Sequence, residues 1–358
     1  MIRLIKPYIS FEEVEESFKN IFASGLLTKG EYVGRFQREL ADYTGASYAF
    51  LTTSATTALS MALKVYGVGV GDEVVVSDFS FPATVNVVED LGAVPVFADV
   101  DIATFNMLPS ELTKKISSRT KAVIFVDAFG NPSGVGEIKA VCEQHKLPLI
   151  EDAACAIGSS ENGVLCGNIA DITCFSFHPR KLLTTGEGGA ITTNDPAVAE
   201  KLEIKLNHGG QVDNEGKWSF IDYGYNFRMN ELQAAMGLVQ LSKLDSITEE
   251  RRVIRQCYIN ELERIGFQVQ KIGKNVRHNV QSVVFIVPKE IERDQLIRQL
   301  RTHEIETTIG TYCLSTLEYY KRKYGVTNVN SSFLERSTIT FPCFQYVDVT
   351  YIVEKLEQ

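Results

Sequence analysis

The segment Leu149-Ile-Glu-Asp-Ala-Ala-Cys-Ala156 decides the fold class, because an apolar strand runs there into two acids and a row of small residues. A strand of this kind is typical of the buried parallel sheets of α/β proteins, which bind ligands at the carboxyl ends of their strands. We therefore expect Asp152 at a ligand-binding edge. In isolation, an acid here can equally cap the next helix.

The flanking sequence alternates short strands with longer helices from about residue 40 to 200. Runs of β-branched and aromatic residues predict strands at 49–53, 73–77, 94–99, 121–126, 147–152, 172–177 and 189–193. The segments between them predict helices at 56–65, 84–91, 109–116, 134–145 and 196–206. This alternation indicates an α/β fold with a mostly parallel sheet and helices on both faces.

The pattern changes near residue 245. A long charged helix at 247–265 precedes strands at 267–271 and 282–287 and a helix at 292–302. A chain of 358 residues is long enough for about two domains. We therefore expect a large domain at 1–245 and a smaller α+β domain at 246–358.

Composition excludes several classes of protein. The net charge of -9 argues against a nucleic-acid partner. No apolar run is long enough to span a membrane, so we expect no membrane partner and a cytoplasmic location. Seven cysteines without a CxxC pair and five isolated histidines predict neither a disulfide framework nor a metal site.

Three features together suggest a site for pyridoxal phosphate. The turn Thr52–Thr57 follows a strand and opens a helix, where N–H groups and hydroxyls can hold an anion, although Ser and Thr are also ordinary helix caps. Lys181 lies in a glycine-rich turn after the strand at 172–177, and Asp152 ends another strand. The cofactor needs these three groups: an amine for a Schiff base, a carboxylate for the pyridine nitrogen and an anion site for the phosphate.

The chain resembles the DegT/DnrJ/EryC1/StrS aminotransferases, sugar aminotransferases of the type I PLP-transferase (aspartate aminotransferase) fold. The most specific motifs are Phe175-Ser-Phe-His-Pro-Arg-Lys181 with Gly186-Glu-Gly-Gly189, and the segment Gly224–Gly237. Weaker matches are Gly25–Gly30, Ser80–Thr84 and Gly92–Asp99. The resemblance covers nearly the whole chain and implies a large domain with a mostly parallel sheet and a smaller C-terminal α+β domain.

The resemblance also implies roles for individual residues. Lys181 would form the Schiff base, and Asp152 would contact the pyridine nitrogen; these two are the expected catalytic residues. Phe81 would stack on the ring. The expected phosphate ligands are Ala55, Thr56 and Ser176. Asn226 would reach the phosphate bound by a partner subunit, which implies a homodimer.

Three positions around the expected site depart from the family pattern. Cys155 stands where relatives often have Gln or His near the phenolic oxygen of the cofactor, and a thiol is a weaker hydrogen-bond partner. Asp127 stands where many relatives have His, and Ala55 replaces a common Gly. The expected substrate residues are Thr28, His178, Arg228 and Tyr312, with Leu27, Lys29, Asn207, His208 and Thr311 as further candidates.

The resemblance implies transfer of an amino group from L-glutamate to a keto-sugar, attached to a nucleoside diphosphate, with ping-pong kinetics. Lys181 favours transamination, because a dehydratase branch of the family has His at this position. Two alternatives stay open at this point. One is a non-catalytic regulatory or binding protein on the same fold; the other is a different PLP reaction, such as sugar dehydration. The sequence does not determine the sugar, the nucleotide or the carbon that receives the amino group.

Overall fold

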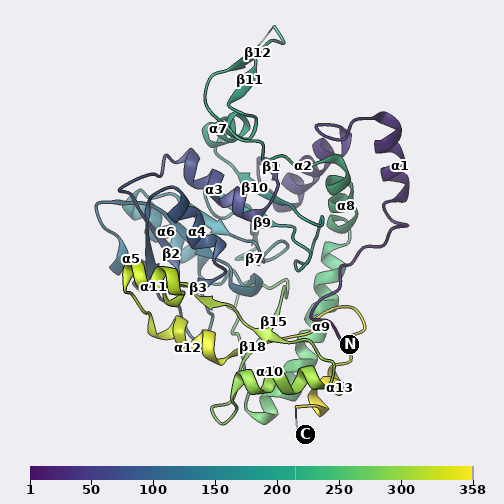
Figure 1. Cartoon of the computed structure of the whole chain (residues 1–358), viewed down its shortest axis with the longest axis vertical. Helices are drawn as coiled ribbons and strands as arrows, with labels where there is room; N and C mark the ends of the chain where they lie inside the picture. The colour runs from purple at the N-terminus through teal and green to yellow at the C-terminus, as the bar shows by residue number, and fades with distance from the viewer. Residues whose placement is uncertain (214, 357–358) are drawn as a thin grey trace.

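The computed structural model describes residues 1–213 and 215–356, and a seven-stranded sheet forms its centre (Figure 1). The strand order is β1-β10-β9-β6-β5-β2-β4. The bounds are β1 Tyr48–Thr52, β2 Glu73–Ser77, β4 Val94–Ala98, β5 Thr120–Val126, β6 Leu149–Asp152, β9 Ile172–Ser176 and β10 Gly189–Thr193. Strands β4, β2, β5, β6 and β9 pair in parallel, and β10 runs antiparallel to both of its neighbours. The expected mostly parallel sheet is confirmed.

Helices cover both faces of this sheet, as expected. Successive residues of a strand point to opposite faces, so Val74 and Val76 pack with one group of helices and Val75 with another. The first face carries α3 (Ala55–Val65), α4 (Ala83–Asp90) and α7 (Pro196–Leu206). The other face carries α2 (Glu31–Thr44), α5 (Pro109–Lys115), α6 (Val135–His145) and α8 (Glu231–Leu241).

The predicted elements of this part agree closely with the structure. The strands at 73–77 and 189–193 and the helix at 196–206 have the predicted bounds, and the others differ by at most two residues at either end. The sequence pattern does not predict α1 (Glu15–Ser24), α2 or α8.

A second, antiparallel sheet of order β13-β15-β18-β16 forms in the C-terminal part. Its strands are β13 Gln268–Val269, β15 Val283–Ile286, β16 Thr308–Ile309 and β18 Thr338–Phe341. The helices α9 (Leu244–Leu262), α10 (Arg293–Thr302) and α13 (Val349–Glu354) share an apolar cluster with it. The expected strand at 267–271 is three residues too long, because Gln270 and Lys271 leave the sheet and bond to the backbone of Thr104 and Ala103.

The N-terminal residues also lie against this second sheet (Figure 1). Ile2 pairs with Ile305, and the carbonyl of Leu4 accepts a hydrogen bond of 3.0 Å from the N–H of Cys343. In the opposite direction, β17 (Tyr312–Cys313) returns to the large sheet region and pairs with β3 (Phe79–Ser80). The two parts are therefore joined by several passes of the chain, and the division between residues 245 and 246 stays a prediction.

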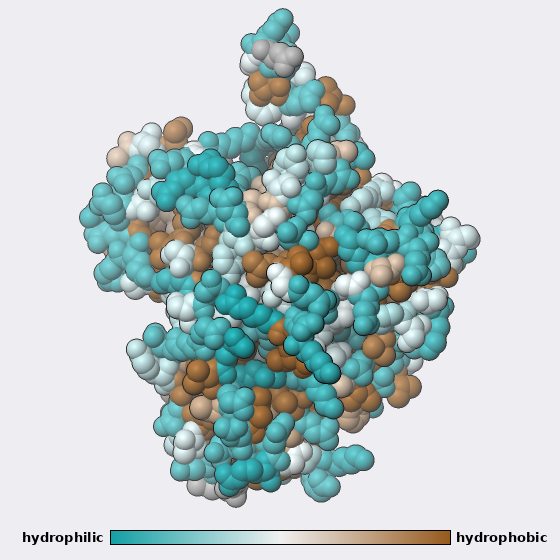
Figure 2. All heavy atoms as spheres, turned by 180° about the vertical axis from the view of Figure 1, so that it is seen from behind, coloured by the Kyte–Doolittle hydropathy of each residue, from teal (hydrophilic) through white to brown (hydrophobic). Residues whose placement is uncertain are grey.

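A hairpin of β11 (Gly210–Val212) and β12 (Trp218–Phe220) projects from the large part (Figure 1). Several of its large apolar and aromatic side chains are exposed: Val212, Trp218, Phe220, Ile221 and Tyr223. Figure 2 shows brown, hydrophobic atoms among hydrophilic ones on this projection. No helix within residues 1–213 and 215–356 is long and apolar enough to cross a membrane.

Candidate active site

Asp152 lies at the carboxyl end of β6, in the interior of the large sheet. Its side chain is almost fully buried, and its Oδ2 accepts a hydrogen bond of 2.8 Å from the hydroxyl of Thr84. Burial raises the pKa of Asp152, whereas the Thr84 hydroxyl and the positive charge of Lys181 act in the opposite direction. A cation placed against this carboxylate would therefore be strongly favoured.

Lys181 follows β9 in a turn that leads back into β10. Its Nζ donates a hydrogen bond of 3.1 Å to Sγ of Cys155. Lys181, Cys155, Asp152 and Phe81 line one cavity of about 210 Å³. The structure thus brings four of the expected cofactor residues to one space, from β6, the turn after β9 and the segment after β3.

The N-terminus of α3 supplies groups for an anion. Ser54 caps the helix, and its Oγ accepts a hydrogen bond from the N–H of Thr57. The N–H groups of Ala55 and Thr56 are in the first turn, where a helix offers them no partner of its own. The positive end of the helix dipole adds to this preference for an anion.

Gly189 allows β10 to approach this helix start closely. A Cβ at Gly189 would lie 2.5 Å from the carbonyl carbon of Ser54 and 2.7 Å from the nitrogen of Ala55. The partner of Gly189 on β9 is Ser176, which is buried. The expected phosphate ligands Ala55, Thr56 and Ser176 therefore come together around one glycine.

Phe81 and Tyr312 form an aromatic pair at the cavity. Their ring centroids are 6.3 Å apart at an angle of 60°. Phe81 is 65% exposed although it lines the cavity, so its ring face is free to cover a flat ligand. Thr311, which precedes Tyr312, also lines the cavity.

Other expected residues do not line the Lys181 cavity. The described residues that line the cavity of Lys181 do not include four of the expected residues: Thr28, His178, Asn226 and Arg228. Arg228 donates to Oδ1 of Asn207 at 3.2 Å and lines a second cavity with Lys29. Thr28, His178 and Asn226 also have local partners: Thr28 pairs with Asn230, Asn226 pairs with Asn207, and the ring of His178 accepts from the N–H of Arg180.

Two residues that support the site were not singled out from the sequence. Gln281, far along the chain, accepts from the N–H of Leu182 and donates to the carbonyl of Arg180, both at 2.7 Å, so it holds the backbone on either side of Lys181. No local signal marks it. Thr84, the partner of Asp152, lies in the motif Ser80–Thr84, where its role could have been recognised.

These groups fit pyridoxal phosphate. The cavity offers an amine, a buried carboxylate and an exposed aromatic face. The start of α3, which does not belong to the lining of this cavity, offers N–H groups for a phosphate. The space of about 210 Å³ lies below the roughly 300–1,000 Å³ of pockets for drug-sized ligands. It therefore suits a small flat cofactor better than a complete nucleotide sugar.

Comparison with known proteins gives a consistent result. The DegT/DnrJ/EryC1/StrS aminotransferase family matches residues 9–357. GDP-perosamine synthase from Vibrio cholerae is 32% identical over 90% of this chain and 88% of its own length. The dTDP-3-amino-3,6-dideoxy-alpha-D-galactopyranose transaminase from Aneurinibacillus thermoaerophilus is 35% identical over 75% of this chain and 73% of its own. The aminotransferase TlmJ from Streptoalloteichus hindustanus has a crystal structure with a TM-score of 0.92, 27% identity and coverage of 99% and 98%.

Proposed function

Because this chain belongs to the DegT/DnrJ/EryC1/StrS aminotransferase family, whose members depend on pyridoxal phosphate, we propose that it moves an amino group from L-glutamate to a nucleotide-linked keto-sugar. The aminotransferase class follows from the family; the donor, the acceptor and the residue roles are the proposal. The observation that carries it is the single cavity shared by Lys181, Asp152 and Phe81.

Each residue has a defined task in this proposal. Bound pyridoxal phosphate supplies an electron-withdrawing ring that stabilises negative charge on the α-carbon of the amino donor. Asp152 holds the ring nitrogen in its protonated state, and the start of α3 holds the phosphate. The free amine of Lys181 would take a proton from the donor α-carbon as general base and deliver it to the reactive carbon of the cofactor as general acid.

The acceptor needs surface beyond this cavity. Relatives named as GDP-sugar and dTDP-sugar enzymes support an acceptor sugar that carries a nucleoside diphosphate. Lys29 and Arg228, at the second cavity of about 580 Å³, carry positive charge but lie away from Lys181 of the same chain. We propose that the protein is a homodimer in which Asn226 and the exposed hairpin residues face the partner subunit. The cytoplasmic location stays a prediction.

The first experiment tests the cofactor and its attachment point. The visible absorption of the purified chain is recorded before and after borohydride, and the reduced protein is digested and mapped by mass spectrometry. We expect a band that disappears on reduction and a phosphopyridoxyl mass on the Lys181 peptide. Lys181→Ala should lose that adduct and all turnover, whereas Lys201→Ala, an exposed lysine on α7, should keep both.

A second experiment separates transamination from the alternatives. L-glutamate added to the loaded enzyme without an acceptor should yield one equivalent of 2-oxoglutarate and shift the absorption band, as a ping-pong reaction requires. Nucleotide keto-sugars should then restore the original band. If no amino donor yielded its corresponding 2-oxo acid, a dehydratase or a non-catalytic protein on this fold would be favoured.

A further inference from the structure

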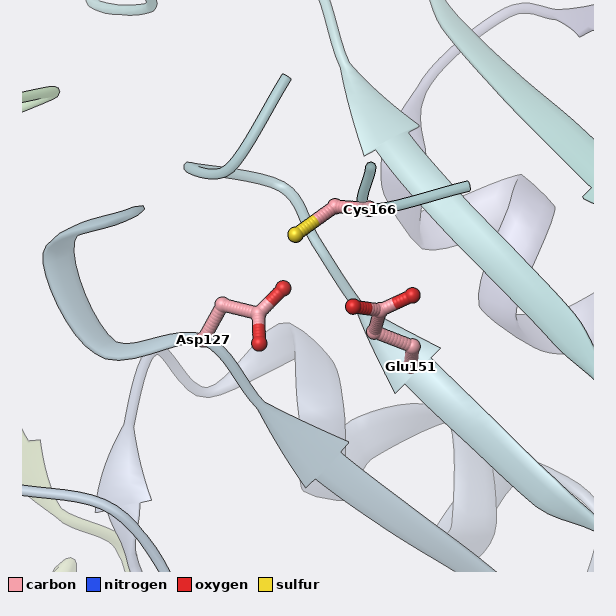
Figure 3. Close-up of side chains that lie close together, drawn as sticks. All are labelled: Asp127, Glu151 and Cys166. Carbon is pink, nitrogen blue, oxygen red and sulfur yellow. The ribbon is translucent and has the colours of Figure 1, made fainter. Parts of the chain in front are cut away.

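A second buried group of titratable side chains lies behind the proposed cofactor site. Asp127 follows β5, Glu151 lies on β6, and Cys166 precedes β9; their side chains point toward one another (Figure 3). All three are at most 1% exposed. One carboxyl oxygen of Asp127, one of Glu151 and Sγ of Cys166 all lie within 4.8 Å of one another. Two buried carboxyl groups at this distance cannot both be ionised at low cost.

The hydrogen-bond donors around the pair are unevenly divided. Oε2 of Glu151 accepts from the hydroxyl of Thr173 at 2.6 Å and from the N–H of Gly167 at 3.5 Å. Among the described residues, no strong donor reaches Oε1 of Glu151 or either carboxyl oxygen of Asp127, and the adjacent thiol of Cys166 is only a weak donor. A buried carboxylate without donors is far less stable than one with two. Glu151 is therefore the better place for the negative charge and Asp127 for the proton.

We propose that Asp127 is protonated and donates its O–H to Oε1 of Glu151, and that this pair is a positioning device for Asp152. The proton joins Oε1 of Glu151 to one of the two carboxyl oxygens of Asp127 and leaves one negative charge instead of two. The positioning role rests on the proposed function, in which Asp152 holds the cofactor nitrogen. The shared proton itself does not.

The backbone links the pair to Asp152. Glu151 and Asp152 are neighbours on β6 and point to opposite sides of the strand. The N–H of Asp127 donates to the carbonyl of Asp152 at 3.2 Å. A change in the charge or position of Asp127 therefore acts directly on the strand end that carries Asp152, and a second negative charge there would disfavour ionised Asp152.

The surrounding charges agree with this assignment. Burial raises the pKa of Asp127 well above its usual range, and the adjacent Glu151 raises it further. Burial also raises the pKa of Glu151, whereas its hydrogen bonds to Thr173 and Asp127 oppose the rise. Three other titratable groups face the pair: Asp152 on β6, Cys166 in the loop before β9, and Cys174 on β9. Lys181 faces Asp152 from across the cavity.

The test compares the full chain with Asp127→Asn, in which an amide N–H replaces the proton and cannot be lost. Asp42→Asn, an exposed residue on α2, is the control for the same chemical change. Thermal unfolding is followed from about pH 5 to pH 9, together with the infrared band of protonated carboxyl groups. The unfolded chain loses the Asp127 proton near pH 4, whereas the folded chain keeps it, so this contribution to stability falls as the pH rises.

We expect the difference in Tm, Asp127→Asn minus the parent chain, to increase by about 2 °C for each pH unit as the pH rises through this range. The control should follow the parent chain. The parent chain should also show a carboxylic acid band at neutral pH that Asp127→Asn lacks. If Asp127→Asn fails to fold, the band of the parent chain and the flattened pH profile of Glu151→Gln serve as the test.

Parallel Tm curves with no difference in the infrared band would overturn the shared proton. So would one equivalent of bound metal that Asp127→Asn loses, because a cation would then replace the proton. The positioning role is tested separately by titrating the spectrum of bound pyridoxal phosphate to alkaline pH. The cofactor spectrum of the parent chain should change at the pH where its carboxylic acid band is lost, and that of Asp127→Asn should not. If the spectrum of the parent chain stayed constant through this pH, the positioning role would be overturned. Failure to bind pyridoxal phosphate would instead contradict the proposed function and leave the infrared result intact.

Discussion

Gly189→Ala is the substitution whose effect follows most directly from the geometry. The new methyl group would meet the carbonyl carbon of Ser54 at 2.5 Å and the nitrogen of Ala55 at 2.7 Å. Ordinary contacts begin at 3.4 Å, so β10 and the start of α3 must move apart by roughly 0.9 Å. Both obstacles are backbone atoms, so no side chain can rotate away. Overpacking of this kind costs about 1–3 kcal/mol, which corresponds to a fall in Tm of about 1–4 °C for a chain of this size.

The same movement disturbs the N–H groups that we assign to the phosphate. Loss of one hydrogen bond to a charged group costs about 1.5–3 kcal/mol, so pyridoxal phosphate should bind roughly 10- to 150-fold more weakly. Fluorescence titration of the cofactor-free chain measures this affinity, and calorimetry measures Tm. Gly69→Ala is the matched control, because nothing lies within 4 Å of its Cβ position and its φ is outside the left-handed region. If Gly189→Ala lowered Tm but bound the cofactor as tightly as the parent chain, our placement of the phosphate would be refuted.

Three further predictions concern single buried groups. Asp152→Asn should retain bound cofactor but slow the half-reaction with glutamate about 10- to 150-fold, since the amide carries no charge for the ring nitrogen; an unchanged single-turnover rate would assign that task to another group. Glu231→Gln should lower the free energy of unfolding by about 1–3 kcal/mol in urea titrations, because Glu231 accepts from three backbone N–H groups at the start of α2 and an amide has only one oxygen to offer; an unchanged urea midpoint would contradict this. Burial lowers the pKa of His278 to about 3, so stability should be lost as the pH falls from about 6.5 towards 3, and His278→Gln, which can still donate to the carbonyl of Phe129, should flatten this loss in Tm measurements; identical acid profiles would disprove it.

The residues that sequence patterns located best are those at strand ends. Parallel strands bring their carboxyl ends to one edge of the sheet. Asp152 at the end of β6 and Lys181 after β9 are therefore expected near each other once the βαβ pattern is recognised. The glycine motif before β10 was equally informative, because Gly189 packs directly on the start of α3. Local pattern and tertiary position agree at these points.

Local sequence patterns do not predict contacts between segments that lie far apart in the chain. Helix α2 begins without a side-chain cap of its own, and its N–H groups are satisfied by Glu231, about 200 residues away. Gln281 likewise supports the backbone around Lys181 from the C-terminal part. The expected substrate residues Thr28 and Arg228 do not line the Lys181 cavity, and Arg228 lines a second cavity with Lys29 instead, a placement that no local pattern predicts.

The N-terminal strip beside the second sheet has a consequence for biosynthesis. Ile2 pairs with Ile305, and the carbonyl of Leu4 accepts a hydrogen bond from the N–H of Cys343. These N-terminal residues therefore cannot form their native contacts until the ribosome has added more than 300 further residues. At about 5–20 residues per second, that interval is roughly 17–70 s. The large sheet can fold during this time, whereas the second sheet and its N-terminal neighbour can close only after Cys343 has been synthesised. A conformation-specific probe of the second sheet should therefore respond only to nascent chains in which Cys343 has left the ribosome.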